Sequence, residues 1–235
     1  MLAIAKPAGL VVHYDGKTKE PSVVDWIIKK YPDMKEVGEP TTLSTGEVIY
    51  RPGIVHRIDR DTSGVLLIAK NQKTFEFLKA QFHDREIHKT YHAFVYGEIA
   101  EFEGVISKPI GRGRRDFRQF AVGREARGEM REAVTNYTVL LKGKIDREGY
   151  SFVEVKPKTG RTHQIRVHFK SIHNPIVCDK LYAPKRPPAL GFERLALHST
   201  RLEIMKPDRE ILIIEAPFPR DFKTAKKLLE VAAVK

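Results

Sequence analysis

The chain has 235 residues, of which 41% are hydrophobic and 31% are charged, a composition that excludes a disordered protein and predicts a soluble globular one. Its 42 Lys and Arg residues outnumber 30 Asp and Glu residues, and the formal net charge of +12 favours an anionic partner, most commonly nucleic acid. The single cysteine, Cys178, excludes an internal disulfide and a cysteine-based zinc cluster.

The same features bear on where the protein works. A single cysteine favours a reducing compartment. The N-terminal apolar run ends at Lys6 and Pro7, too early for the core of a signal peptide, and no apolar run reaches the roughly 20 residues of a membrane helix. We therefore expect a cytoplasmic protein without a membrane segment.

In chain order, the first hundred residues predict short strands and two capped helices. Ser22 can cap a helix that runs to Tyr31, and Asn71 can cap an amphipathic helix. Residues 33–52 are polar and rich in Gly, Pro and Thr, which indicates a loop. Apolar or β-branched segments typical of strands occupy residues 2–5, 65–69 and 89–96.

The remaining residues predict strand pairs, with fewer helices. Residues 111–128 are rich in Gly and Arg and are expected to form a basic loop, with Arg131 just beyond it. Thr162 can cap a helix that runs to Ile172, and residues 222–233 predict a last helix. Strand pairs are expected at 134–141 with 150–156 and at 201–205 with 210–215. We expect an α+β fold with a largely antiparallel sheet, in one domain over residues 1–235.

Neither a metal site nor a nucleotide cofactor is predicted. His88 and His92 are four residues apart, but on a strand that spacing spans roughly 13 Å, too far to share an ion. His163 and His168 are five apart and fall on different faces of a helix. The sequence has no phosphate-binding loop and no dinucleotide fingerprint.

Segment 56–64, His-Arg-Ile-Asp-Arg-Asp-Thr-Ser-Gly, places acids among arginines just before a predicted strand. A nearby guanidinium favours the ionised form of a carboxylate, and an ionised, oriented Asp59 is suited to nucleophilic attack. A structural Asp–Arg ion pair explains the same pattern. From this segment alone, the structural ion pair is the favoured interpretation.

Two further segments change that balance. Segment 158–168, Lys-Thr-Gly-Arg-Thr-His-Gln-Ile-Arg-Val-His, begins in a glycine turn and enters a helix, so that its N–H groups and basic side chains can bind phosphate. Its apolar positions also fit a buried helix face, and both interpretations can hold together. Segment 89–97 carries Tyr91 on a strand, where it is either a core residue or a ring that stacks on a base or moves a proton.

Taken together, these three segments resemble the RluA-type pseudouridine synthase family. The order and approximate spacing agree along nearly the whole chain, with weaker support from Lys-Pro-Ala-Gly at 6–9, from Asn174-Pro175, and from Asp179 with Tyr182. Ile58 stands where the family usually has leucine. Many relatives carry an N-terminal S4 RNA-binding domain, and we expect none here because the catalytic-type sequence begins at residue 2.

The resemblance implies a mixed, largely antiparallel sheet with flanking helices and a central cleft into which a uridine is flipped out of structured RNA, ribosomal or transfer. It implies that Asp59 is the catalytic aspartate, that Tyr91 removes the C5 proton and that Arg166 pairs with Asp59. It also implies that Arg57 fills the space that the base leaves, and no cofactor or metal is implied. Other basic residues of the three segments are expected to bind the substrate: Arg60, Lys89, Arg161 and His163.

Two other functions remain open from the sequence. A non-catalytic RNA-binding or assembly module on the same fold would bind RNA without isomerising a base, although binding alone does not require Asp59, Tyr91 and Arg166 together. A nucleoside hydrolase or glycosidase using Asp59 and Asp61 fits less well, because acids two residues apart on one loop poorly match a pair that flanks a sugar. We expect a monomer.

Overall fold

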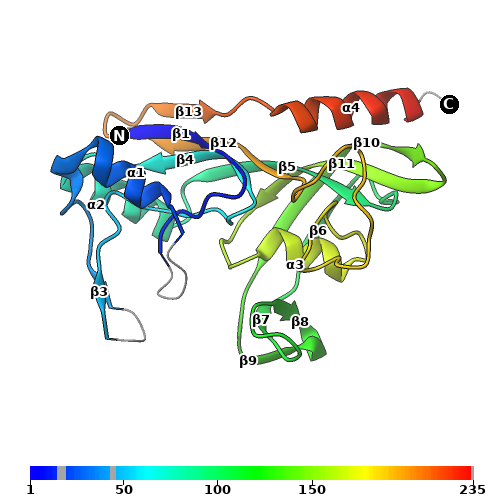
Figure 1. Cartoon of the computed structure of the whole chain (residues 1–235), viewed down its shortest axis with the longest axis horizontal. Helices are drawn as coiled ribbons and strands as arrows, with labels where there is room; N and C mark the ends of the chain where they lie inside the picture. Colours follow the sequence, from blue (N-terminus) through cyan, green and yellow to red (C-terminus); the bar gives the residue numbers. More distant parts are fainter. Residues whose placement is uncertain (15–19, 43–45, 234–235) are drawn as a thin grey trace. The chain divides into compact units, whose positions relative to one another are not determined.

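The structure of the protein is a computed structural model, which describes residues 1–14, 20–42 and 46–233 (Figure 1). The chain forms two compact units. The first unit consists of Met1–His88 and Arg201–Ala216, and the second consists of Lys89–Thr200 and Pro217–Lys235. The expected single domain stays a prediction.

The first unit is built on a short antiparallel sheet. Strand β1 (Leu2–Lys6) pairs with β4 (Ser63–Ile68), and β4 neighbours the part of β12 (Leu197–Met205) that belongs to this unit. Strand β13 (Ile211–Glu215) pairs with the same part of β12 and completes the hairpin that the sequence predicts. Every residue of β4 is buried, as expected for an apolar run in the middle of a sheet.

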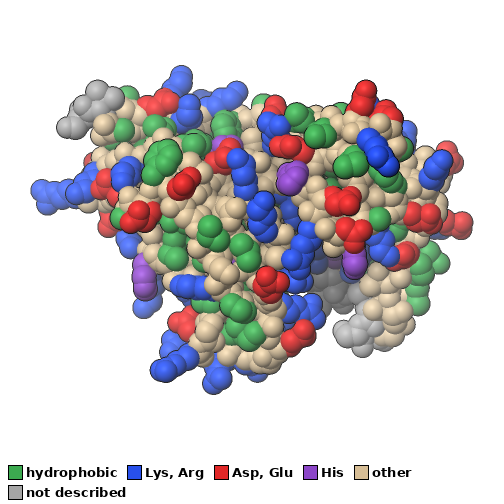
Figure 2. Space-filling model, turned by 180° about the vertical axis from the view of Figure 1, so that it is seen from behind, with side chains coloured by type: hydrophobic (Ala, Val, Ile, Leu, Met, Phe, Trp, Pro, Cys, Tyr) green, Lys and Arg blue, Asp and Glu red, His purple; other side chains and the backbone are tan. Residues whose placement is uncertain are grey.

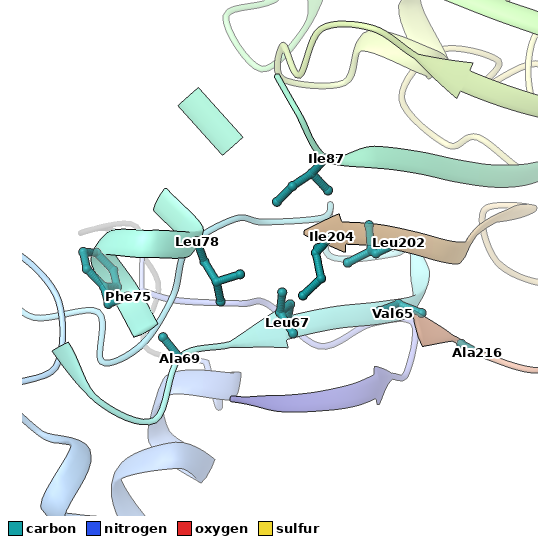
Figure 3. Packing of buried hydrophobic residues seen from close by; sticks show 9 residues of the cluster. All are labelled: Val65, Leu67, Ala69, Phe75, Leu78, Ile87, Leu202, Ile204 and Ala216. Atoms are coloured by element: carbon teal, nitrogen blue, oxygen red, sulfur yellow. The ribbon is translucent and has the colours of Figure 1, made fainter. Parts of the chain in front are cut away.

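Helices cover both faces of β4, because successive side chains of a strand point to opposite sides. Val65 and Leu67 pack with Leu78 of α2 (Gln72–His83), in the cluster that Figure 3 shows. Leu66 and Ile68 pack instead with residues of α1 (Val23–Lys30). Both helices begin at the predicted caps, since Ser22 accepts a hydrogen bond from Asp25 N and Asn71 accepts one from Thr74 N.

The second unit contains the longer strands. The part of β12 within this unit is followed by β5 (His88–Tyr96), β11 (Glu148–Pro157), β10 (Val134–Ile145) and β6 (Glu103–Ser107). The described ladders among these strands, β5 with β11, β11 with β10 and β10 with β6, are antiparallel. Helix α4 (Arg220–Ala233) packs along β10, and α3 (Gln164–Ser171) carries the second basic segment (Figure 1). The predicted α+β class with a largely antiparallel sheet is confirmed.

Residues 110–131 form a small antiparallel sheet in the second unit, so the prediction of a basic loop there is wrong. Strand β7 (Ile110–Gly113) lies between β8 (Phe120–Val122) and β9 (Ala126–Arg131). Ile110 joins Val167 of α3 in a buried cluster, which packs this small sheet against the helix. The pairing depends on contacts between distant residues, which the Gly- and Arg-rich composition does not reveal.

Two local predictions also differ from the structure. Helix α3 begins after His163, a residue with the left-handed φ of 56°, whereas Thr162 was the expected cap. Across the predicted loop at 33–52, the structure has a 3₁₀ turn that begins one residue earlier, at Pro32–Met34, and a short ladder of β2 (Thr41–Thr42) with β3 (Val48–Ile49). Residues 43–45 of the predicted loop lie outside the described residues.

An aromatic cluster forms part of the core of the second unit and encloses His92. The His92 ring stacks on Phe152 at 5.4 Å and meets the edge of Phe218 at 5.0 Å, while its Nδ1 lies 2.7 Å from the Thr200 hydroxyl. Burial lowers the pKa of His92 to about 4, with smaller effects from Glu154, which raises it, and from His198 and Lys156, which lower it. His92 is therefore neutral at physiological pH.

This burial predicts that the second unit loses stability in acid. An unfolded histidine binds its proton near pH 6.5, so between about 6.5 and 4 the unfolded chain binds more protons than the folded one. The free energy of unfolding should be constant above this window and fall by about 3 kcal/mol across it. Urea unfolding of the wild type at pH 7 and pH 4 measures the effect.

The variant His92→Phe should keep the ring contacts and lose this titration, so its stability should depend less on pH. Part of the dependence should remain, because burial also lowers the pKa of His168. His83→Phe is the matched control, since the His83 side chain is 84% exposed. An unchanged pH dependence in His92→Phe would contradict the prediction.

Candidate functional site

The predicted site residues are distributed over both units. Arg57, Asp59 and Arg60 belong to the first unit, in the irregular segment that leads into β4. The second unit holds the remaining predicted residues, Lys89, Tyr91, Arg161, His163 and Arg166, on β5 and around the start of α3. Within each unit, the structure shows what holds these side chains.

Asp59 is half-buried at the start of a tight turn. The Asp59 carbonyl oxygen accepts a hydrogen bond from Thr62 N at 3.1 Å, and Thr62 is buried. Ile58 is also buried, whereas Arg57 and Arg60 are exposed. The alternation places the apolar residue in the core and the two guanidinium groups at the surface, with the Asp59 carboxylate at the boundary.

Lys6 joins the N-terminal strand to the Asp59 turn. Its side chain is 1% exposed, and its ammonium group donates to the carbonyl oxygens of Pro7, Leu10 and Arg60 at 2.9, 2.7 and 2.8 Å. Gly9 N donates to the same Arg60 oxygen at 2.9 Å. No local sequence pattern indicates this role of Lys6, because Arg60 lies 54 residues away in the chain.

The variant Lys6→Met should destabilise the first unit by about 3 kcal/mol, because it leaves three carbonyl oxygens without their charged donor. Urea unfolding measures the change. Lys79→Met is the control, since the Lys79–Glu39 ion pair is exposed on both sides and such pairs contribute at most about 1 kcal/mol. Equal losses in the two variants would show that Lys6 does not hold the turn.

His56 and Arg60 fix the two ends of the Asp59 segment. The His56 Nε2 accepts a hydrogen bond from Leu67 N of β4 at 2.8 Å, and its ring stacks on Phe82 at 4.6 Å. Arg60 donates from Nε to the Gly9 carbonyl oxygen at 3.2 Å and forms an exposed ion pair with Glu20 at 3.3 Å. The backbone around Asp59 is thus held from both sides.

Two arginines of the first unit lie close together. Burial lowers the pKa of Arg51, and the neighbouring charge of Arg57 lowers it further. The Arg51 Nε is buried and has no hydrogen-bond partner among the described residues. Adjacent positive charges suit an anionic ligand, because a phosphate bound near them would relieve their repulsion.

In the second unit, Tyr91 lies on β5 opposite Val155 of β11 and is 8% exposed. Lys89 is half-buried two residues earlier, so its side chain leaves the strand on the same side. A Cβ atom placed on Gly160 would lie 3.5 Å from the Lys89 Nζ, which brings Lys89 next to the turn that precedes α3. The structure therefore groups Lys89 with the second basic segment.

Gln164 fixes the turn that carries Arg161 and His163. Its Oε1 accepts hydrogen bonds from the Thr159 hydroxyl at 2.7 Å and from Arg161 N at 3.0 Å, and its Nε2 donates to Val134 O. The Arg161 Nε donates to the Glu132 carbonyl oxygen at 3.0 Å. Gln164 therefore joins the turn rigidly to the sheet, a role that no local sequence pattern indicates.

Arg166 forms a buried ion pair with Asp179. The Arg166 Nε and Nη2 donate to the two Asp179 carboxylate oxygens at 2.8 and 2.9 Å, and the Asp179 side chain is fully buried. Asp179 Oδ1 also accepts from Leu181 N and Tyr182 N, each at 3.0 Å. This bidentate pair fixes the plane of the guanidinium. The predicted pairing of Arg166 with Asp59 stays a prediction.

Tyr182 completes the surroundings of Arg166. Its ring centroid lies 4.9 Å from the Arg166 Cζ, a cation–π contact. The Tyr182 hydroxyl accepts a hydrogen bond from Phe120 N at 2.9 Å and lies 2.9 Å from the His163 Nδ1. Asp179 and Tyr182 counted only as weak support for a family resemblance in the sequence. The Asp-x-x-Tyr spacing was the one sequence signal that these two residues hold the Arg166 guanidinium.

Two further properties of the described residues concern metals and membranes. Among residues 1–14, 20–42 and 46–233, no group of three or more His, Cys, Asp or Glu side chains is placed to hold a metal ion. In the same part of the chain, none of the helices has the length and apolar character to cross a membrane.

Comparison with known proteins gives consistent matches. A family profile described as RNA pseudouridylate synthase matches residues 1–171. The chain is 34% identical over 225 residues to an uncharacterized RNA pseudouridine synthase of Synechocystis, covering 95% of the chain and 64% of the relative. It is 36% identical over 223 residues to ribosomal large subunit pseudouridine synthase D of Borreliella burgdorferi, covering 94% and 64%. The chain thus spans slightly less than two thirds of the length of these relatives.

Two solved structures are also similar. Human RNA pseudouridylate synthase domain containing 1 superposes with a TM-score of 0.71 at 25% identity, covering 92% of this chain and 79% of the human one. Human RNA pseudouridylate synthase domain containing 4 superposes with a TM-score of 0.70 at 26% identity, covering 97% and 89%. Both matches extend over nearly the whole chain.

Proposed function

The chain belongs to the RNA pseudouridylate synthase family, and on that premise we propose that it isomerises specific uridines of structured RNA to pseudouridine. The observation that carries the proposal is the half-buried Asp59, on a turn that Lys6 and His56 hold in place. A fixed carboxylate at the edge of the core is suited to act on a sugar that enters from solvent.

The proposed reaction breaks the N1–C1′ bond, turns the detached base and joins C5 to C1′. The C5 proton is lost and N1 gains one, so nothing is oxidised and no energy donor is required. The Asp59 carboxylate either attacks C1′ or removes the C2′ proton. Flipping the uridine out of the RNA costs a few kcal/mol, which contacts to phosphates and stacking offset. Arg57, exposed beside Asp59, fills the space that the base leaves.

Tyr91 and Arg166 complete the proposed catalytic group. Tyr91 removes the C5 proton after the new bond has formed. Arg166 pairs with Asp59 and keeps the carboxylate charged in a site with little water. Support for this role comes from the Asp179 pair, which holds the Arg166 guanidinium in one orientation before any substrate binds.

Basic residues outside this group bind the RNA phosphates in the proposal. Arg60 lies on the Asp59 turn, and Lys89, Arg161 and His163 lie around the start of α3. The adjacent Arg51 and Arg57 support an anionic ligand at the first unit. The net charge of +12 would increase the rate of encounter with RNA and make binding sensitive to salt.

The substrate class and the setting form part of the proposal. The Borreliella relative is named for the large ribosomal subunit, which supports ribosomal RNA as a substrate, and transfer RNA is the other candidate. We place the chain in the cytoplasm as a monomer that needs no metal or cofactor.

Tritium release tests the proposal directly. The purified chain is incubated with RNA transcripts that contain 5-tritiated uridine, and the RNA is then mapped for pseudouridine at base resolution. The expected result is release of tritium to water in proportion to pseudouridine at a few defined positions. RNA binding without tritium release would overturn the proposal in favour of a non-catalytic RNA-binding module. Free uracil as the product would indicate a hydrolase.

A further inference from the structure

A hollow of about 520 Å³ opens beside the small sheet of β7, β8 and β9 in the second unit. Its volume falls within the range of about 300–1,000 Å³ that is typical of ligand sites. The turn before α3 forms one wall, so the hollow adjoins the second basic segment. The lining residues that matter for binding are Arg112, Phe120, Arg127, Glu129, Arg131 and Arg161.

Four arginines against one acid make the hollow strongly positive. The Arg127 backbone belongs to the β7–β9 ladder, and its side chain makes no hydrogen bond or ion pair with the described residues. Arg131 pairs with Glu129 at 3.1 Å, but both side chains are exposed and such pairs contribute little. The Arg161 guanidinium is held by the Glu132 carbonyl oxygen. Guanidinium groups at such sites bind phosphate oxygens in pairs.

Arg112 and Phe120 form a flat stacking surface in the same hollow. The Arg112 Cζ lies 4.6 Å from the Phe120 ring centroid, and the Arg112 Nη1 donates to the Phe117 carbonyl oxygen at 3.3 Å. These contacts hold the exposed guanidinium over the ring. Arginine planes and aromatic rings are the surfaces on which proteins stack unpaired RNA bases. The hollow therefore offers both a phosphate site and a stacking surface.

A short series of contacts joins the hollow to Arg166. Phe120 N donates to the Tyr182 hydroxyl at 2.9 Å, and the Tyr182 ring packs against the Arg166 Cζ at 4.9 Å. Arg161 lies five positions before Arg166 in the chain. Neither Arg166 nor Tyr91 lines the hollow among the described residues, so a nucleotide bound there would occupy a subsite distinct from these two residues.

We propose that this hollow binds one unstacked nucleotide that flanks the target uridine, with its phosphate on Arg127, Arg131 and Arg161 and its base on the Arg112–Phe120 stack. The inference rests on the proposed function and adds to it a second point of RNA recognition. Figure 2 shows Lys and Arg side chains, interspersed with Asp and Glu, on the lobe that the small sheet forms. Because stacking and phosphate contacts do not read base edges, this subsite selects single-stranded geometry rather than sequence.

The first test compares two double variants with equal loss of charge. Arg127→Gln/Arg131→Gln removes two arginines of the hollow, and Arg220→Gln/Lys223→Gln removes two cations from α4, which lies on the other side of the second unit's strands (Figure 1). Binding of a fluorescein-labelled single-stranded oligouridylate is measured by anisotropy at several salt concentrations. Circular dichroism and thermal unfolding establish that both variants are folded.

The hollow variant should bind about tenfold more weakly than the wild type. Its slope of log K against log salt should fall by about 0.7, because both arginines contact the one phosphate of the bound nucleotide and each single-strand phosphate neutralised contributes about 0.7. The α4 variant should keep the wild-type slope. Equal losses in the two variants would overturn the proposal, since they would reflect overall charge, and so would a wild-type chain that fails to bind the oligouridylate.

The second test addresses the stacking platform. Arg112→Lys keeps the charge and removes the guanidinium plane, so binding of the oligouridylate should weaken several-fold while the salt slope stays unchanged. Binding of a duplex RNA of equal length should not change, because its bases are already stacked. Equal weakening on both RNAs would overturn the stacking role.

Turnover separates this inference from the proposed function. With an RNA that the wild type modifies, the hollow variants should raise KM and leave kcat unchanged, because the subsite binds a nucleotide that does not react. A lowered kcat with an unchanged KM would contradict the proposal that the hollow binds a nucleotide that does not react. If the wild type released no tritium from any RNA but showed the predicted binding differences, the isomerase proposal would fail and the RNA-binding hollow would stand.

Discussion

Replacing Asp59 with asparagine should abolish pseudouridine formation and leave RNA binding intact. Asparagine has nearly the same shape, but it neither attacks C1′ nor takes a proton from C2′. The turn should persist, because the contacts of Lys6 and His56 and the Thr62 N–H bond to the Asp59 carbonyl oxygen involve other groups. Loss of a nucleophile of this kind lowers turnover by on the order of 10⁴-fold or more. Single-turnover tritium release measures it.

Asp61→Asn provides the control for Asp59→Asn. Asp61 is exposed two residues further along the same segment, and the substitution makes the same change of charge. This variant should keep nearly wild-type turnover, and anisotropy should give both variants the wild-type affinity for RNA. Substantial turnover in Asp59→Asn, or an equal loss in Asp61→Asn, would remove Asp59 from the catalytic role.

The accuracy of the sequence predictions depended on how local the determining contacts are. Helices α1 and α2 begin where predicted, because Ser22 and Asn71 bond to N–H groups three residues away. Strand β4 was identified because a short, wholly apolar run between turns is typical of a buried strand. The small sheet was missed because its support comes from far away in the chain, as when Gln119 Nε2 donates to Leu181 O.

In the candidate site, too, features set by neighbouring residues could be predicted, whereas contacts between residues distant in the chain could not. Asp59 and Arg166 were selected from short motifs, but the residues that hold them were not. The Lys6 ammonium reaches Arg60 across 54 positions, and Arg166 meets Asp179 across 13. His163 caps α3 in a left-handed conformation, for which residue statistics favour glycine or asparagine. Motifs therefore indicated the candidate reactive groups, whereas the residues that hold them could be identified only from the fold.

The buried Arg166–Asp179 pair should be the most sensitive point of the second unit. Asp179→Ala leaves the Arg166 guanidinium buried without its partner carboxylate, which costs about 3–5 kcal/mol in comparable pairs. Two backbone N–H groups, of Leu181 and Tyr182, also lose their acceptor. We expect a loss of stability in that range by urea unfolding, together with a large loss of turnover at temperatures where the variant is folded.

Asp221→Ala is a matched control, because Asp221 forms a similar two-point pair with Arg194 in the same unit at 2.7 and 3.0 Å, but the pair is partly exposed. Its loss should cost about 1–2 kcal/mol and leave turnover unchanged. Equal losses in the free energy of unfolding in the two variants would show that burial does not make the Arg166–Asp179 pair more important for stability than a partly exposed pair.

A double variant separates the structural part of Arg166 from its part in the reaction. Arg166→Met/Asp179→Leu removes both charges and fills the space with apolar groups, which in buried pairs restores much of the lost stability. If Arg166 served only to support the fold, turnover should return with stability. If Arg166 acts on the Asp59 carboxylate as proposed, the double variant should be stable and inactive, and its RNA affinity should stay near that of the wild type. Recovery of turnover in the double variant would therefore refute the catalytic role of Arg166 without affecting that of Asp59.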